Sequence, residues 1–403
     1  MHELDQLVVF RNIRENEILI SFRNFIAEND RNYKIEQLFK LQYLILNHEC
    51  LKVFSWKEII LKIILTDENI FSLKCENGDS IDSTLITLTT GDVKILRDVY
   101  NYDWINQLEE LSIKRSTLFT LNDCRNSEYL ELHNLFANEN LGETFIVKEL
   151  IKYLNTYGTG MYSKNYVFKW NDTKKLTPIH KFDQVSFSDL IGYERQINCL
   201  KENTNAFINK GKANNVLLYG QRGTGKSSSL KALASEYSSV GLRIIELRKK
   251  DIEQITLITD IIRERNYKFI IFIDDLSFEE FETDYKNFKA IIEGSFEKKP
   301  DNVLIYVTSN RRHLIRESFK DREEDVHSNE TLQEKLSLFD RFGITILYDQ
   351  PKDELYNEMV ITLAERNGIT LPKHELLRLA NEWKISKSSK SGRTAQQLID
   401  TLI

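Results

Sequence analysis

The stretch Gly220-Gln-Arg-Gly-Thr-Gly-Lys-Ser227 fits the phosphate-binding pattern G-x-x-x-x-G-K-[ST]. An apolar run, residues 214–219 (NNVLLY), leads into it, and a helix-forming run, residues 227–236 (SSSLKALASE), follows. Glycines let backbone N–H groups wrap a phosphate, and the start of a helix adds its positive end. In such a loop Lys226 reaches the outer phosphates of a nucleotide and the Ser227 hydroxyl holds Mg²⁺. A plain glycine turn would explain neither the lysine nor the residues described next.

Two adjacent acids end another apolar run, residues 269–273 (FIIFI), which is followed by Asp274 and Asp275. A buried strand has little use for paired carboxylates unless a cation lies at its end. We expect Asp274 to hold Mg²⁺ and Asp275 to polarise an attacking water molecule. The alternative is a solvated strand end without a catalytic role.

A polar side chain also follows the next apolar run, residues 302–308, which leads through Ser309 to Asn310. An asparagine in this position is often only a turn residue. Its place after the acid pair and its strand favours a different role. We expect Asn310 to reach the γ-phosphate or the attacking water.

Two arginines complete the predicted catalytic set. Arg341 lies in the segment SLFDRFG before the fifth apolar run, and Arg393 lies in the segment SGRTA near the C-terminus. A guanidinium near a transferring phosphoryl group stabilises its negative charge in the transition state. The alternative for either arginine is a solvated surface position.

The pattern of apolar residues changes along the chain. Residues 1 to about 157 carry apolar residues at helical spacing, and short apolar runs then alternate with helical patterns. The five runs expected to form strands are residues 216–219, 242–247, 269–273, 303–308 and 344–348. We therefore predict an α/β fold: a five-stranded parallel sheet, a C-terminal helical lid and a mainly helical N-terminal domain. The predicted domains are residues 1–177, 178–350 and 351–403.

Composition narrows the functional class. The chain has 403 residues with a net charge of −6 and no basic block, which weakens the case for a nucleic-acid partner. The four cysteines form no C-x-x-C pair, so we expect reduced thiols and no zinc site. The N-terminal residues are acidic where a signal peptide is basic, and no apolar run reaches the ~18 residues of a membrane span. We expect a cytoplasmic protein without a membrane partner.

The order of these motifs resembles that of the AAA+ ATPases. More narrowly, it resembles a bacterial ATP-binding family, domain of unknown function 815. The strings that carry this narrower resemblance are LIGYERQ, ANNVLLYG, GTGKSS, GLRIIE, FIDDLSFE, TSNRRHLI, EKLSLFDRFG and SGRTAQQ. They extend almost continuously from Phe182 to Ile403, and residues 158–170 resemble the segment that precedes that domain. The resemblance implies ATP and Mg²⁺ as cofactors and names no substrate.

The resemblance also implies residue roles. Asn310 becomes sensor 1, Arg341 the arginine finger that acts on a neighbouring subunit, and Arg393 sensor 2. A homo-oligomer is therefore expected. The segment from Asp189 to Gly192 resembles the part that contacts adenine. The expected nucleotide-binding residues are Gly220, Gln221, Arg222, Gly223, Thr224, Gly225, Lys226, Ser227, Ser228, Ile191 and Gly192.

Two departures from most AAA+ motors bear on activity. Asp275 stands where most have glutamate and is one methylene shorter, which predicts slow turnover, with Glu279 and Glu280 as alternative catalytic acids. Residues 248–251 (RKKD) stand where unfoldases carry a pore-loop aromatic, which argues against peptide threading.

The leading functional hypothesis is an ATPase that remodels an unidentified protein partner, which it contacts through residues 1–177. Two alternatives remain. One is a nucleotide-gated binding module with little turnover. The other is a loader or initiator acting on DNA, suggested by the Asp-Asp pair and by Arg311 and Arg312.

Overall fold

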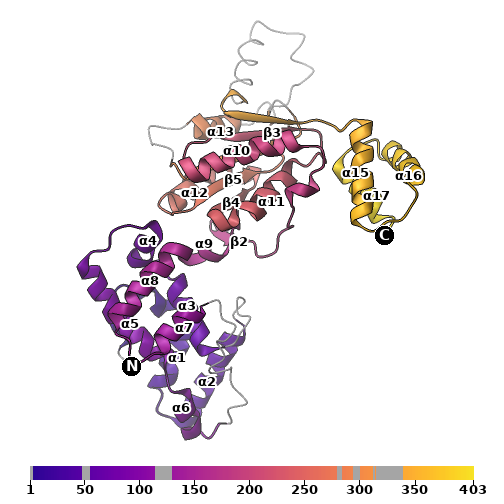
Figure 1. The fold of residues 1–403 in the computed structure, drawn as a ribbon. Helices are drawn as coiled ribbons and strands as arrows, with labels where there is room; N and C mark the ends of the chain where they lie inside the picture. The colour runs from indigo at the N-terminus through magenta and orange to yellow at the C-terminus, as the bar shows by residue number, and fades with distance from the viewer. Residues whose placement is uncertain are drawn as a thin grey trace. The chain divides into compact units, whose positions relative to one another are not determined.

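The computed structural model describes residues 3–47, 55–113, 129–278, 284–293, 300–311, 314 and 339–403 (Figure 1). Two compact units make up the chain, Met1–Lys164 and Asn165–Ile403. The structure thus divides the chain after Lys164, whereas the sequence-based boundary followed residue 177. The difference arises because residues 167–178 form two strands that join the sheet of the second unit.

The first unit is helical in its described residues. Its helices are α1 (Glu17–Ala27), α2 (Arg31–Leu46), α3 (Trp56–Thr66), α4 (Ile70–Asn77), α5 (Ser83–Tyr100), α6 (Trp104–Glu110), α7 (Leu130–Ala137), α8 (Glu143–Tyr157) and α9 (Gly160–Lys164). Several begin at a side-chain cap, as where Asp30 accepts the N–H groups of Asn32 and Tyr33. Their apolar faces meet in a core that includes Trp56 and Trp104, whose ring centroids lie 5.2 Å apart.

A buried carboxylate holds the N-terminal segment on this unit. Asp92 of α5 accepts the backbone N–H groups of Val8, Val9 and Phe10, at 2.7 Å for Val9 and 2.9 Å for Phe10. A buried carboxylate is tolerated when such donors replace water. The segment before α1 is therefore part of the packed unit.

The second unit contains one sheet with the strand order β2-β1-β4-β5-β6-β3-β7. The strands are β1 (Val167–Trp170), β2 (Leu176–Pro178), β3 (Val216–Gly220), β4 (Leu242–Leu247), β5 (Lys268–Ile273), β6 (Val303–Ser309) and β7 (Ile344–Tyr348). All neighbouring pairs are parallel except β1 and β2. The predicted strands form a parallel set, but the sheet in the described residues has seven strands instead of five. The two additional strands are short: β1 pairs in parallel with β4, and β2 forms the edge of the sheet beside β1.

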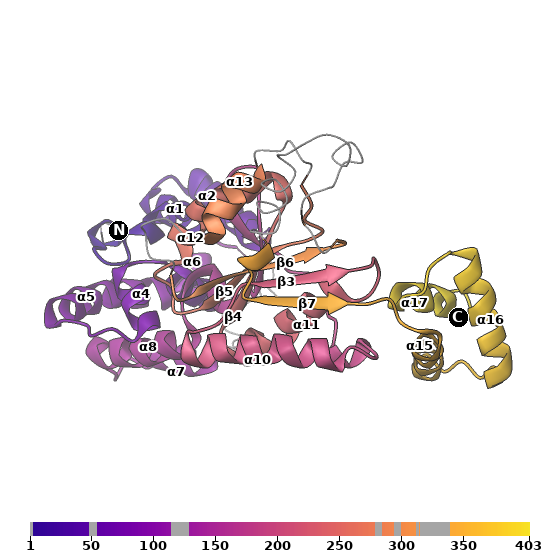
Figure 2. The same ribbon diagram turned by 90° about the horizontal axis from the view of Figure 1, so that it is seen from above.

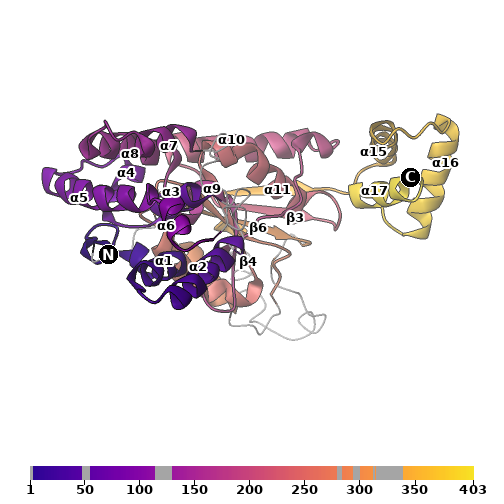
Figure 3. The ribbon, with the colours of Figure 1, turned by 90° about the horizontal axis from the view of Figure 1, so that it is seen from below.

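Helices flank this sheet and follow it. They are α10 (Glu194–Lys210), α11 (Lys226–Tyr237), α12 (Ile255–Ile262), α13 (Asp284–Glu293), α15 (Asp353–Arg366), α16 (Lys373–Ser386) and α17 (Gly392–Asp400). Figure 2 shows α10 and α11 over one face of the sheet and α12 and α13 over the other. The last three helices pack against one another, as Figure 3 shows, and bury Val360, Ala380 and Ile399.

The parallel pairing positions the site. Leu218 of β3 lies opposite Thr308 of β6, and Ile273 of β5 lies opposite Val307. The carboxyl ends of these three strands therefore meet at one edge of the sheet, where open α/β sheets bind ligands. In the parts of the chain that the structure describes, no helix combines the length and apolar character needed to cross a membrane.

Candidate functional site

Positive φ angles shape the glycine-rich loop between β3 and α11. Gly220, Gly223 and Gly225 have φ values of 139°, 77° and 96°. A Cβ atom on Gly220 would lie 2.0 Å from the backbone oxygen of Tyr348, and one on Gly223 would lie 2.7 Å from the Ser391 hydroxyl. Side chains are excluded at both positions, because the loop passes directly against β7 and the start of α17.

Lys226 is buried at the first residue of α11 and points back into this loop. Its Nζ donates to the backbone oxygens of Gly220 (2.8 Å) and Gln221 (2.7 Å), and to Oδ1 of Asn310 (3.2 Å). Burial lowers the pKa of Lys226 to about 8, although the carboxylates of Asp275 and Asp274 oppose the shift. The loop therefore holds a desolvated amine whose charge depends on nearby anions.

A hydroxyl and a carboxylate meet where the loop faces β5. The Ser227 Oγ donates to Oδ1 of Asp274 at 2.6 Å, and the Thr308 hydroxyl donates to the same oxygen. Hydroxyl and carboxylate oxygens are the ligands that Mg²⁺ prefers, and Mg²⁺ commonly takes few protein ligands beside phosphates and water. The described residues contain no group of three or more His, Cys, Asp or Glu that could hold a metal alone. Ser227 and Asp274 thus fit a shared Mg²⁺ site of the predicted kind.

Asp275 occupies a strained position beside Asp274. Its φ is 49°, a region that non-glycine residues rarely adopt and that costs about 1–3 kcal/mol. Its N–H donates to the Thr308 Oγ1 at 2.9 Å, and its carboxylate accepts a hydrogen bond from the Asn310 Nδ2. The Nη2 atom of Arg222 lies 3.8 Å from the other carboxylate oxygen, Oδ2 of Asp275. Such strain persists where the surroundings impose it, and here Thr308 and Asn310 do so.

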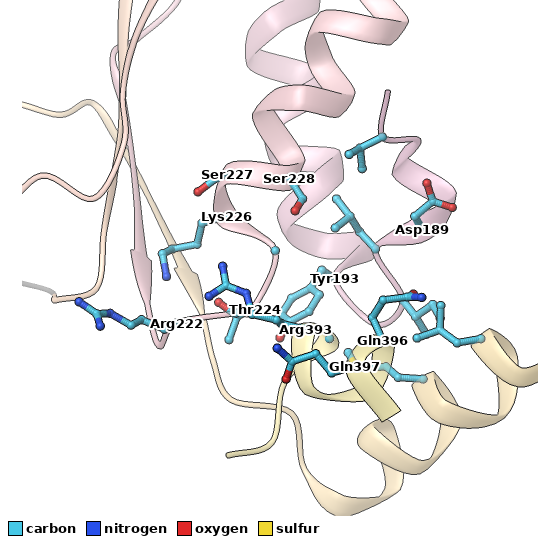
Figure 4. Close-up of a pocket in the computed structure, with 18 of the residues that line it drawn as sticks. Asp189, Tyr193, Arg222, Thr224, Lys226, Ser227, Ser228, Arg393, Gln396 and Gln397 are labelled. Carbon is cyan, nitrogen blue, oxygen red and sulfur yellow. The ribbon is translucent and has the colours of Figure 1, made fainter. Parts of the chain in front are cut away.

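These groups line one cavity of about 970 Å³ (Figure 4). Its lining includes every residue from Arg222 to Ser228, with Asp274, Asp275, Asn310 and Ile191. Gly220 and Gln221 do not line the cavity but accept hydrogen bonds from Lys226. Gly192 is also outside the lining and packs against Leu355. The volume lies within the range typical of small-molecule sites.

The structure places the two predicted arginines differently. Arg393 of α17 lines the cavity, and its backbone N–H donates to the backbone oxygen of Gly223 at 3.4 Å. Arg341 is exposed just before β7 and does not line this cavity. Its action on a neighbouring subunit remains a prediction. The alternative acids Glu279 and Glu280, and Arg312, lie outside the described residues.

Sequence reasoning missed several residues of the site. Thr308 binds both aspartates, and Tyr193 stacks on Tyr348 with ring centroids 5.2 Å apart. Three polar residues of α17 line the cavity beside Arg393: Gln396, Gln397 and Asp400. Figure 4 labels Gln396 and Gln397. A sequence signal existed for these three, because residues three and four apart share one face of a helix.

One comparison with known proteins matches almost the same residues as the second unit. A family model described as protein of unknown function (DUF815) matches residues 163–403. Similar solved structures include a single-residue mutant of RuvB from Thermotoga maritima, with 18% identity, a TM-score of 0.37 and coverage of 53% of this chain and 64% of that chain. Another is the Thermotoga maritima RuvB described as a Holliday junction branch migration motor, with 16% identity, a TM-score of 0.34 and coverage of 54% and 72%. No curated protein sequence matches the chain.

Proposed function

This chain belongs to the family described as protein of unknown function (DUF815), and we propose for it the function of a Mg²⁺-dependent ATPase of the AAA+ type. In this proposal, ATP binding and hydrolysis change the state of an unidentified protein partner, which residues 1–177 contact. Residues 178–350 form the nucleotide-binding domain in this proposal, and residues 351–403 form its lid. The active form is a homo-oligomer.

The observation that carries this proposal is the convergence of three groups of side chains in one cavity. Lys226 follows the glycine-rich loop, Ser227 shares a hydrogen bond with Asp274, and Asn310 contacts both Lys226 and Asp275. A phosphate chain needs a cation, a metal position and a group that orients water. The three groups line the same cavity and supply these needs.

The chemistry follows from these positions. Phosphate oxygens accept hydrogen bonds from the backbone N–H groups of the loop. They also replace the carbonyl oxygens of Gly220 and Gln221 as the partners of the Lys226 amine. Ser227 and Asp274 would hold Mg²⁺, which would neutralise negative charge on the transferring phosphoryl group. Asp275 accepts a hydrogen bond from the attacking water and increases its nucleophilicity, while Asn310 orients the Asp275 carboxylate.

Nucleotide binding and turnover by the full chain test the proposal. We expect a fluorescent ATP analogue to bind in Mg²⁺ and to bind more weakly after chelation with EDTA. Phosphate release should accompany ATP binding and stop in EDTA. Absence of nucleotide binding in Mg²⁺ would refute the proposal.

A second candidate, a nucleotide-gated switch with little turnover, has support in the surroundings of Asp275. This carboxylate is shorter than the usual glutamate, and both of its oxygens face partners, Asn310 on one and Arg222 on the other. A carboxylate held in this way is less available to water. Phosphate release of at most a few turnovers per minute would favour the switch over the motor.

The exposed position of Arg341 outside the cavity fits action on a neighbouring subunit. We expect Lys226→Ala and Arg341→Ala each to lose hydrolysis as pure proteins, and their mixture to regain part of it. Some interfaces in the mixture combine an intact loop with an intact arginine. The measurement is phosphate release at several protein concentrations, since assembly makes activity concentration-dependent.

The matched control is a mixture of Lys226→Ala with Asp275→Asn, which alters two residues of the same cavity. Every cavity in that mixture carries one of the two substitutions, because both residues belong to the same site of one subunit, so this mixture should stay inactive. A mixture of Lys226→Ala and Arg341→Ala that stays inactive, although the two variants co-assemble, would contradict the role of Arg341 in trans.

A further inference from the structure

One arginine joins two distant segments that both line the cavity. Arg366, the last residue of α15, lies 3.2 Å from Oδ1 of Asp189, and its other terminal nitrogen donates to the backbone oxygen of Ser188 at 2.9 Å. Asp189 and Arg366 are separated by 177 positions in the sequence. The contact therefore connects the C-terminal helices to the segment before α10.

A hydrogen bond that does not involve Arg366 fixes the position of the Asp189 carboxylate. Its other oxygen, Oδ2, accepts the N–H of Ser186 at 2.9 Å and caps the 3-10 helix Phe187–Asp189. Oδ1 is left to face Arg366. The carboxylate is thus prepositioned, and the guanidinium is the group that can leave.

A second contact brings the same two segments together. Gly192 has a φ of 81°, and a Cβ atom there would lie 2.2 Å from the Leu355 side chain. Leu355 belongs to the first turn of α15 and Arg366 to its end. The segment from Asp189 to Gly192 therefore meets α15 at both ends of the helix, along one wall of the cavity.

From this arrangement we infer that Arg366 and Asp189 form a latch that controls exchange of the bound nucleotide; this inference rests on the proposed function. A ligand in the cavity lies between the glycine-rich loop, α15 and the segment around Asp189. Its release requires α15 and that segment to separate, and separation breaks the Arg366 contacts. The pair thus stabilises the closed form and slows dissociation.

Dissociation of a fluorescent ADP analogue from the full chain tests the latch. Arg366→Ala and Asp189→Asn should each increase the dissociation rate about two- to fivefold, the range expected for an exposed ion pair. The double variant should match Arg366→Ala, because the contact that Asp189→Asn removes is already absent in that variant. Asn at position 189 keeps an oxygen that can cap the 3-10 helix.

Salt dependence separates a latch from a general loss of structure. Added salt screens an exposed ion pair, so the rates of wild type and Arg366→Ala should converge as ionic strength rises. The control is Arg378→Ala, which breaks an exposed pair with Glu382 within α16, outside the cavity lining. It should leave the dissociation rate unchanged.

Three different results would overturn the inference. Normal binding of the ADP analogue with an unchanged dissociation rate in both single variants overturns the latch alone. Failure of the wild-type chain to bind the analogue overturns the proposed function and the latch together. Additive effects in the double variant also contradict a shared contact.

Discussion

Replacement of Lys226 by alanine is expected to weaken ATP binding about a hundredfold and to abolish hydrolysis, while the fold is retained. Charged hydrogen bonds contribute about 1.5–3 kcal/mol each, and a phosphate chain that loses a buried cation loses more than one contact. Stability should change little, since the partners of Lys226 in the described part of the chain are the loop oxygens of Gly220 and Gln221 and the Asn310 side chain. The measurements are ATP affinity by titration and thermal unfolding by circular dichroism.

The control for this variant is Lys231→Ala, on the same helix. Lys231 is half exposed, pairs with Asp183 at 2.6 Å and does not line the cavity. Its replacement should leave ATP affinity unchanged. Equal affinities of Lys226→Ala and wild type would contradict the role given to this loop.

The pKa of Lys226 adds a pH test. Burial lowers this pKa to about 8, and bound phosphates raise it because they favour the ammonium form. Above about pH 8, binding must therefore take up a proton. ATP affinity should then fall by up to about tenfold per pH unit. The Lys226→Arg variant keeps its charge and should show a much flatter dependence.

Replacement of Asp275 by asparagine is expected to preserve ATP binding and to slow hydrolysis about 10²- to 10⁴-fold, the usual contribution of a general base. The amide oxygen of asparagine can still accept the hydrogen bond from Asn310, so the loop keeps its position. Single-turnover phosphate release at saturating ATP measures the step. Hydrolysis at the normal rate would instead point to Glu279 or Glu280.

Asp274→Ala provides the contrasting variant on the adjacent residue. Asp274 accepts hydrogen bonds from the Ser227 and Thr308 hydroxyls. Its replacement by alanine removes the carboxylate at the proposed Mg²⁺ position. We expect ATP binding to lose its dependence on Mg²⁺ in this variant but to keep it in Asp275→Asn. Identical behaviour of the two variants would show that the roles of the two acids are not separate.

Motifs formed by residues close together in the sequence could be predicted from the sequence alone. The turns at Gly220, Gly223 and Gly225 need positive φ, and Lys226 and Ser227 follow at fixed spacing, so the loop is encoded locally. The acids Asp274 and Asp275 were readable for a similar reason, since they end a strongly apolar strand. Parallel strands bring such strand ends to one edge of the sheet, where Asn310 hydrogen-bonds to Asp275.

Features that depend on distant partners were not readable. Strand β1 is short, and only its pairing with β4 identifies it as part of the sheet. The sheet therefore has two strands more than predicted, and the two units divide after Lys164 instead of after residue 177. Thr308 resembles any strand threonine until β5 and β6 lie side by side and its hydroxyl meets both aspartates. Arg366 and Asp189 are ordinary charged residues along the chain. Only packing of the C-terminal helices brings them together, because a contact across 177 positions has no local sequence signal.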